Sequence, residues 1–424
     1  ENFSKFEYEN PVARLKESDG EVKNSVTRYN ANIIFNPIDN LTLNSVLSYV
    51  RSTRNHGYSE TLNHVSALRD GNDGWSSVGA NTRMEKTAEI TALYKNKIGD
   101  HDFSVLGGYS YNENDYEDMY FANYGFQDDY FGGWHNIGIG SALKLGKANA
   151  NSSKYTSNLI GFFGRGTYGY KNKYLLMSSI RYEGASQLWG TDNEWGLFPS
   201  ISLGWRISEE QFMKDQQIFD DLKLRVGYGV TGSQPGNPFL GVAMLSYDKY
   251  AYVDGKWLQT IVPASNANPD LKWEEKKETN IGVDFVSLNN RLSGSIDLYK
   301  RKVDGLIYDY TVPTPPNVYP TTVANGGVME NKGLEILISA IPIISKDFEW
   351  NTSVTFSTNK NKLNSLDGSE FKTDYDYFNT GWLAEPVKTE SHRVQVGEAI
   401  GNFWGFKVVD VNEDGKWIYE DRNG

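Results

Sequence analysis

Apolar and polar residues alternate along several segments of this chain, and the alternation separates two unlike faces. In the clearest segment one face carries Leu222, Leu224, Val226, Tyr228 and Val230, and the other carries Lys223, Arg225, Gly227 and Gly229. A period of two residues predicts a β-strand with two different environments. An apolar face opposite a charged and small face favours a strand with lipid on one side and water on the other.

The same period predicts twelve strands. They cover residues 24–36, 41–52, 84–96, 101–113, 156–170, 173–184, 197–208, 221–232, 279–287, 290–302, 332–341 and 347–360. Many of them reach about ten residues, which is the length that a tilted strand needs to cross a bilayer. Aromatic residues near the strand ends predict interfacial girdles; they are Tyr170, Tyr174, Tyr182, Trp205, Tyr299 and Trp350.

Short polar connections alternate with long ones. The short connections are 36–40, 96–100, 171–173 and 289–290, and the long ones include 52–83, 114–155 and 233–279. In an outer-membrane barrel, short turns face the periplasm and long loops face the outside. We therefore expect an all-β, transmembrane antiparallel β-barrel. One connection, from Ser208 to Asp221, begins with a serine followed by two acids, which predicts a short helical plug on the periplasmic side.

Composition narrows the function classes. The chain has 424 residues and no cysteine, which excludes thiol nucleophiles and cysteine-based metal sites. Its formal charge of −12 and the lack of a basic patch argue against nucleic-acid binding. No apolar run approaches the roughly 18 residues of a membrane helix. A membrane barrel must leave no free edge, yet the chain ends at Gly424 in a polar segment. We therefore expect the chain to be the central part of a larger barrel.

Ordered motifs then indicate a family. They are RYEGAS at 181–186, WGLFPS at 195–200, GWRISEEQF at 204–212, LKLRVGYGVTGSQ at 222–234, NPDLKWE at 268–274, NIGVD at 280–284, NGG at 325–327 and NKGLE at 331–335. Together they resemble the SusC/RagA family of TonB-dependent outer-membrane transporters from Bacteroidetes. Ser233 stands where the family motif has asparagine. Before Tyr155 the resemblance is one of pattern more than motif.

The resemblance implies a barrel of 22 strands with an N-terminal plug, energised through TonB and covered by a SusD-like (RagB-like) surface lipoprotein. Residues 1–424 would then form one partial β-barrel domain, with the plug and the closing C-terminal strands outside this chain. The resemblance implies import of oligosaccharides across a Gram-negative outer membrane. Because the family also includes peptide importers, an oligopeptide is the alternative cargo.

Two sets of residues are candidates for contacting a ligand. The first set is aromatic and lies in the long connections: Trp75, Tyr120, Tyr124, Tyr130, Trp134, Trp189 and Trp257. Aromatic rings stack on sugar rings, and neighbouring amides and carboxylates suit hydroxyl groups. The same residues could hold a peptide or the lipoprotein, or pack within the loops. The second set faces the predicted lumen: Arg165, Lys223, Arg225 and Asp284. From both sets we predict ligand contacts at Trp75, Tyr130, Trp134, Trp189, Arg165 and Arg225.

Residues 410–415 are a candidate Ca²⁺ loop. Asp410, Asn412 and Asp414 supply oxygens at positions 1, 3 and 5, Gly415 follows, and Asp421 falls at position 12. A turn rich in Asp, Asn and Gly explains the same pattern. Residues 227–232 match the dinucleotide fingerprint, but the following prolines cannot open the helix that this site needs. Five scattered histidines give no zinc spacing.

The leading hypothesis is thus a transporter without enzymatic chemistry and without a required cofactor. The alternative from another class is a soluble or surface β-rich binding protein with no role in transport. No motif supports an enzyme.

Overall fold

A computed structural model describes residues 10–129, 133–214, 216, 218–368, 375–383 and 388–420. Twelve strands form one sheet in the order β1-β2-β3-β4-β5-β6-β7-β8-β11-β12-β13-β14. Every neighbouring pair whose register is given is antiparallel. Each of the twelve predicted strands corresponds to one strand of this sheet, so the all-β antiparallel prediction is confirmed.

The sheet strands are β1 (Ser18–Ile38), β2 (Leu41–Glu60), β3 (Trp75–Ile98), β4 (His101–Tyr124), β5 (Asn149–Tyr170), β6 (Tyr174–Ala185), β7 (Trp195–Arg206), β8 (Phe219–Ser233), β11 (Glu274–Ser287), β12 (Leu292–Thr311), β13 (Thr321–Ile344) and β14 (Glu349–Gly368). Smaller sheets contain β9 (Leu245–Val253) with β10 (Lys256–Pro263), β15 (Tyr377–Leu383) with β16 (Thr389–Gln395) and β17 (Asn402–Phe403), and β18 (Val408–Val411) with β19 (Trp417–Tyr419). The helices are α1 (Pro11–Lys16), α2 (Val65–Asp70) and α3 (Ser141–Lys144), with 3₁₀ turns η1 (Gly133–Ile139), η2 (Ser186–Leu188), η3 (Ile207–Glu209) and η4 (Gln211–Met213).

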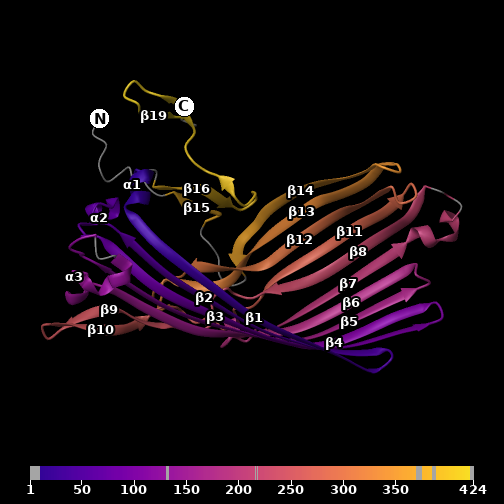
Figure 1. Cartoon of the computed structure of the whole chain (residues 1–424), viewed down its shortest axis with the longest axis horizontal. Coiled ribbons are helices and arrows are strands. Elements are labelled where there is room, and N and C mark those ends of the chain that lie inside the picture. Colours follow the sequence, from indigo (N-terminus) through magenta and orange to yellow (C-terminus); the bar gives the residue numbers. More distant parts are fainter. Residues whose placement is uncertain are drawn as a thin grey trace. The chain divides into compact units, whose positions relative to one another are not determined.

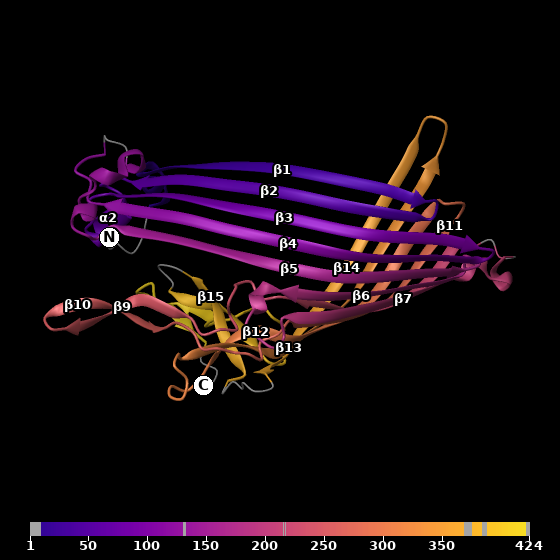
Figure 2. The same ribbon diagram turned by 90° about the horizontal axis from the view of Figure 1, so that it is seen from below.

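The chain divides into two compact units. Unit 1 comprises Glu1–Lys95, Val105–Gly164 and Arg181–Gln187, and unit 2 comprises Asn96–Ser104, Arg165–Ile180 and Leu188–Gly424. Within unit 2, β8, β11, β12, β13 and β14 run as neighbouring strands (Figure 1). Within unit 1, β1, β2 and β3 do the same (Figure 2).

Many strands are longer than predicted. β3, β4 and β13 have 24 residues each, and the predicted loop 52–83 shrinks because β2 continues to Glu60 and β3 begins at Trp75. Apolar and polar residues alternate only where one face of a strand is apolar and the other is polar. The added ends of β3 and β13 are instead packed against other parts of the chain, with Ser76 1% exposed and Thr322 4% exposed. Small and polar residues are buried there, so periodicity does not show where these strands end.

The predicted helical plug is replaced by the two 3₁₀ turns η3 and η4. Glu210 is extended between them, with φ −75° and ψ 149°. Its carboxylate accepts hydrogen bonds from Tyr174, Lys173 and Trp205, and these bonds, led by that from Tyr174, hold the pKa of Glu210 below its usual value. The Ser208 hydroxyl donates to Asp221 instead of capping a helix. The connection therefore folds back onto β6, β7 and β8.

The strands of unit 2 carry two unlike faces. We call the face of β8, β11 and β12 that bears Arg225, Gly282 and Asp297 the inner face, and the opposite face the outer face. Large apolar residues are exposed on the outer face, among them Ile281 at 47% and Leu298 at 55%. The largest fully buried side chains lie elsewhere, chiefly in or near the long connections: Tyr310, Leu188, Leu271, Leu363, His64, Asn123 and Ser76. The sheet thus exposes an apolar surface in place of a central core.

One residue of the predicted girdle was placed on the wrong face. Tyr299 is two residues from Asp297 on β12 and reaches across Gly333 of β13, so it lies on the inner face. Tyr174, Tyr182 and Trp350 are 46–50% exposed. Among the described residues, no helix has the length and apolar character needed to cross a membrane.

Candidate functional site

A cross-strand ion-pair cluster occupies the inner face of unit 2. The register pairs Arg225 of β8 with Gly282 of β11, and Gly282 with Asp297 of β12. The Arg225 guanidinium reaches over the middle strand: its Nη2 lies 3.1 Å from Asp297 Oδ1. It also binds Asp284 in a bidentate manner, with both N–O distances 2.8 Å. Such paired charge-assisted bonds fix the guanidinium more firmly than a single contact would.

Gly282 makes this arrangement possible. A Cβ atom at this position would lie 2.4 Å from Asp297 Oδ1 and 2.7 Å from Arg225 Nη2. The glycine therefore gives the Arg225 side chain the space to cross β11. Gly232 of β8 is also closely approached, because the Phe198 ring covers its backbone.

The cluster borders a polar recess of ≈ 840 Å³. Lys223 and Arg225 line it from β8, and Lys223 Nζ lies 4.0 Å from Asp284. Asp102, Thr167 and Ser202 are among the other lining residues. The recess also reaches the short connections at Gly99–Asp100 and Lys171–Asn172. Positive, negative and hydroxyl groups together make a surface that suits polar partners of either sign.

Two more predicted contact residues of unit 2 are exposed. Arg165 lies in β5, two residues from Thr167 of the recess, so the period of the strand places both on one face. Trp189 follows η2 in the connection to β7 and is 57% exposed. The Trp189 ring is therefore not buried by the surrounding loop and can contact a ligand.

In unit 1, Trp75 and Trp134 both lie against the end of β2. Trp75 begins β3 and its ring centroid lies 5.9 Å from that of Tyr58. Trp134 covers Gly57 with its ring and donates from its backbone nitrogen to Ser59 Oγ at 2.7 Å. Both tryptophans are half-buried, so packing accounts for much of their surface. Tyr130 lies outside the described residues.

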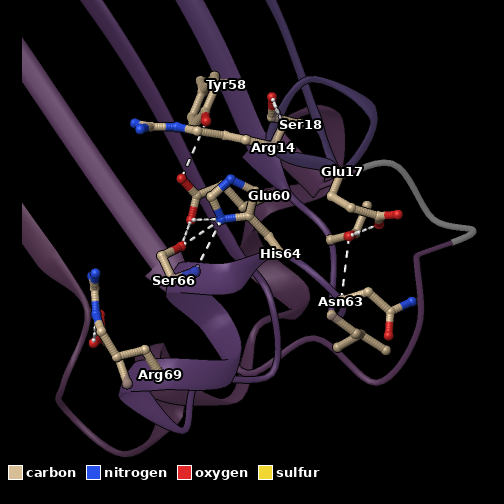
Figure 3. A network of polar contacts seen from close by, with 12 residues as sticks. Arg14, Glu17, Ser18, Tyr58, Glu60, Asn63, His64, Ser66 and Arg69 are labelled. Carbon is tan, nitrogen blue, oxygen red and sulfur yellow. Dashed lines mark hydrogen bonds and ion pairs between the residues drawn. The ribbon is translucent and has the colours of Figure 1, made fainter. Parts of the chain in front are cut away.

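A polar network that the sequence did not reveal joins the same end of β2 to α2 (Figure 3). The Tyr58 hydroxyl donates to Glu60 Oε1 at 3.1 Å, and Glu60 Oε2 accepts from Ser66. His64 Nδ1 lies 2.7 Å from Ser66 Oγ, and the imidazole is 2% exposed. His64 also caps α2 by accepting from the Ser66 backbone nitrogen. The network orders this connection, and spacing along the chain could not have shown it.

Two further groups were missed. Asp297 belongs to the ion-pair cluster. The alternation of residues in β12 indicated which face it lies on, but not that it lies opposite Gly282. The Phe198 ring meets Trp273 edge-on at 5.3 Å between centroids, and Trp273 is 4% exposed. This pair anchors the connection that follows the β9–β10 hairpin.

The candidate Ca²⁺ loop forms a tight hairpin turn between β18 and β19. Asn412 Oδ1 accepts hydrogen bonds from the backbone nitrogens of Asp414 and Lys416, at 3.1 and 2.8 Å. Asp410 Oδ1 accepts from the Val411 nitrogen at 2.7 Å. These bonds are those of an Asp/Asn turn. Asp421 lies outside the described residues, and Ca²⁺ binding stays a prediction.

The dinucleotide-like motif at residues 227–232 lies wholly inside β8. The interpretation that these glycines serve a strand and not a helix N-terminus is confirmed.

A family model described as "TonB dependent receptor-like, beta-barrel" matches residues 3–419. The TonB-dependent receptor SusC of Bacteroides thetaiotaomicron is 34% identical over 375 residues, covering 85% of this chain and 35% of that protein. The TonB-dependent receptor P3 of Formosa agariphila is 28% identical, covering 96% of this chain and 39% of the relative. The chain thus spans between a third and two fifths of the length of these curated relatives.

Solved structures show the same fold. The RagAB peptide transporter aligns with a TM-score of 0.76 at 21% identity, covering 95% of this chain and 42% of the solved chain. The RagAB peptide importer in its open-open state aligns with a TM-score of 0.75 at 20% identity.

Proposed function

The chain belongs to the TonB dependent receptor-like β-barrel family, and on this premise we propose that it forms part of an importer that takes up oligosaccharides. Proteins of this family reside in the outer membrane of Gram-negative bacteria. Import would be energised through TonB, without chemistry on the cargo. A plug and a SusD/RagB-like surface lipoprotein would complete the machine.

The observation that carries the proposal is the contrast between the two faces of β8, β11 and β12. The outer face exposes Val226, Ile281 and Leu298, whereas the inner face carries the Arg225–Asp284–Asp297 cluster. Exposed apolar residues would be costly in water, because each large side chain left exposed forgoes about 1.5–3 kcal/mol of burial. Lipid on one side and a water-filled passage on the other remove that cost.

Aromatic residues in the long connections support an oligosaccharide as the cargo. Trp189 and Trp257 are 57% and 69% exposed, and Tyr250 and Tyr252 of β9 are each 62% exposed. Flat, exposed rings suit the apolar faces of sugar rings, and the recess of the inner face offers partners for hydroxyl groups. An oligopeptide remains the alternative cargo within the same family.

The test begins with the full-length protein purified in detergent together with what it carries. Mass spectrometry of the intact assembly and of its co-purifying ligand is expected to show an oligosaccharide. Calorimetric titration with panels of oligosaccharides and peptides then measures affinity. Trp189→Ala should weaken oligosaccharide binding roughly two- to tenfold, because an aromatic contact contributes about 0.5–1.5 kcal/mol.

Trp350→Ala is the matched control. Trp350 is 50% exposed but lies beside the short connection at the start of β14, so its loss should leave affinity unchanged. Binding of peptides with no binding of oligosaccharides would replace the glycan by the peptide. A protein that binds a ligand but never moves it across a TonB-energised membrane would contradict the importer.

A further inference from the structure

Six lysines gather on the outer face of β11 to β14, in two adjacent rungs of the sheet. The register aligns Lys277, Lys302, Glu330 and Lys362 in one rung, and Thr279, Lys300, Lys332 and Lys360 in the next. Successive rungs on one face are two residues apart along each strand. We call these six lysines the lysine ladder.

The second rung places like charges directly opposite one another. Lys300 faces Lys332, and Lys332 faces Lys360. Directly opposed like charges destabilise a sheet, so this rung is unfavourable unless anions neutralise it. The chain as a whole has a formal charge of −12. A cluster of six lysines on one surface is therefore not explained by the overall composition.

Carboxylates of the protein neutralise only part of the ladder. Asp304 pairs with Lys302 at 2.7 Å and with Lys277 at 3.3 Å, and Glu275 pairs with Lys277 at 3.0 Å. Glu330 pairs with Lys300 at 2.9 Å and lies 3.8 Å from Lys332. Six lysines minus these three carboxylates leaves a charge of +3. Among the described residues, no carboxylate forms an ion pair with Lys360 or Lys362.

The ladder directly adjoins the apolar band of the outer face. The next rung toward the short connections contains Ile281, Leu298 and Leu334, and the rung after it contains Val283, Ile296, Ile336 and Phe356. Ile281, Leu298 and Phe356 are 47–55% exposed. Charged residues therefore begin where the apolar surface ends.

The position of the ladder identifies the boundary of the membrane to which it belongs. Lys300 is eight residues beyond Leu292, the first residue of β12 after its short connection. At ~3.4 Å per residue this is about 27 Å of strand, or roughly 20 Å along the axis at the usual tilt, close to the height of an apolar barrel band. The ladder thus lies at the boundary nearer the long connections, which face the outside.

We propose that the lysine ladder binds the phosphate groups of anionic lipids in the external leaflet of the outer membrane. Ammonium groups at an interface attract anionic headgroups, and the adjoining apolar rungs lie where the acyl chains of the same lipids pack. The site is local to β11–β14. In unit 1, the apolar residues Val105 and Tyr109 of β4 are followed by Glu113, Asp115 and Glu117. The inference rests on the outer-membrane location and not on the cargo.

The experiment compares the full chain in detergent with a variant carrying Lys300→Gln, Lys332→Gln and Lys360→Gln. The probes are a bisphosphorylated lipid A and the same lipid after enzymatic removal of its phosphates, and native mass spectrometry counts the bound lipid. Wild type should retain the phosphorylated lipid in preference to the dephosphorylated one. The variant should lose at least tenfold in apparent affinity, since each lysine at an anionic lipid surface contributes about fivefold. Added salt should weaken the binding.

A matched variant replaces three lysines of short connections by Lys171→Gln, Lys214→Gln and Lys346→Gln, with the same change in net charge. It should bind the lipid as wild type does, and equal loss in both variants would overturn the proposal. So would unchanged binding by the ladder variant, equal retention of the dephosphorylated lipid, or full displacement by millimolar inorganic phosphate, which would indicate a site for free phosphate. If the triple variant fails to fold, Lys332→Gln against Lys332→Arg provides the same test, because only the arginine preserves the charge.

Discussion

At the scale of single residues, the absence of one side chain positions the inner-face cluster. Gly282 lies beneath the Arg225 guanidinium, and a Cβ there would lie 2.7 Å from Arg225 Nη2. Gly282→Ala should push Arg225 away from Asp297 and lower the free energy of unfolding by about 1–3 kcal/mol, because charged groups would lose their hydrogen-bond partners. Urea unfolding of the protein in lipid or detergent measures this loss.

Gly227 is the matched control for Gly282. Gly227 lies in β8, on the inner face that also bears Gly282, and the nearest atom to a Cβ there would be 3.9 Å away. Gly227→Ala should be neutral or slightly stabilising, because alanine restricts the unfolded chain more than glycine does. Equal destabilisation by both substitutions would show that the crossing of Arg225 over Gly282 is not the cause.

Individual residues of the cluster differed in how far the sequence could predict them. Arg225 and Asp284 lie in strands with clear alternation, so their face was evident. Asp297 also alternates with apolar neighbours, but its contact with Arg225 spans two strands and depends on register. Trp134 lies in a connection, and only the folded chain shows that its ring covers Gly57.

At the scale of elements, the short connections are specified by local backbone chemistry. The connection from β11 to β12 contains Leu288, Asn289 and Asn290, and all three have φ between 56° and 64°. Asparagine tolerates this left-handed conformation better than most residues, and β-branched residues tolerate it poorly. Asn290→Val should therefore cost about 1–2 kcal/mol, whereas Asn290→Gly should be neutral.

Unfolding midpoints of the two Asn290 variants in one detergent measure this difference. The Asn290 nitrogen also donates to Asp220, but both substitutions keep that backbone donor. Equal midpoints for valine and glycine would mean that the connection does not require a positive φ.

Strand ends were the least predictable part of each element. β12 continues from residue 302, where the sequence prediction ended, to Thr311. Beyond the lysine ladder, Leu306 packs against a cluster of Leu363, Leu366 and Val394, and Tyr310 is 2% exposed. These contacts come from distant parts of the chain, so the pattern within β12 does not show them. The connection after β7 was misjudged for a related reason. Ser208 has a helix-cap sequence, but its hydroxyl is used by Asp221.

At the scale of the whole molecule, the outer face predicts behaviour in solution. Its apolar surface includes Val226, Ile296 and Leu298, which are 39–55% exposed. We expect the protein to be extracted from membranes only with detergent, and its electrophoretic mobility to change on heating. A monodisperse protein in plain buffer would contradict the membrane location of this surface.

The sequence by itself determined the twelve strands, their antiparallel succession through alternating short and long connections, and the apolar face of those strands with clear alternation. These properties depend on local signals: a two-residue period and turn residues with suitable backbone angles. The motifs of residues 181–335 also indicated the family before any fold was known.

Only the tertiary structure decided which residues of different strands become neighbours. Hydrogen-bond pairing sets the register, and the register brings Arg225, Gly282 and Asp297 into one rung and Lys300, Lys332 and Lys360 into another. A shift of one residue in either strand would move these side chains to opposite faces. Alternation within a strand indicates which way a residue points, but its partner depends on where the next strand begins.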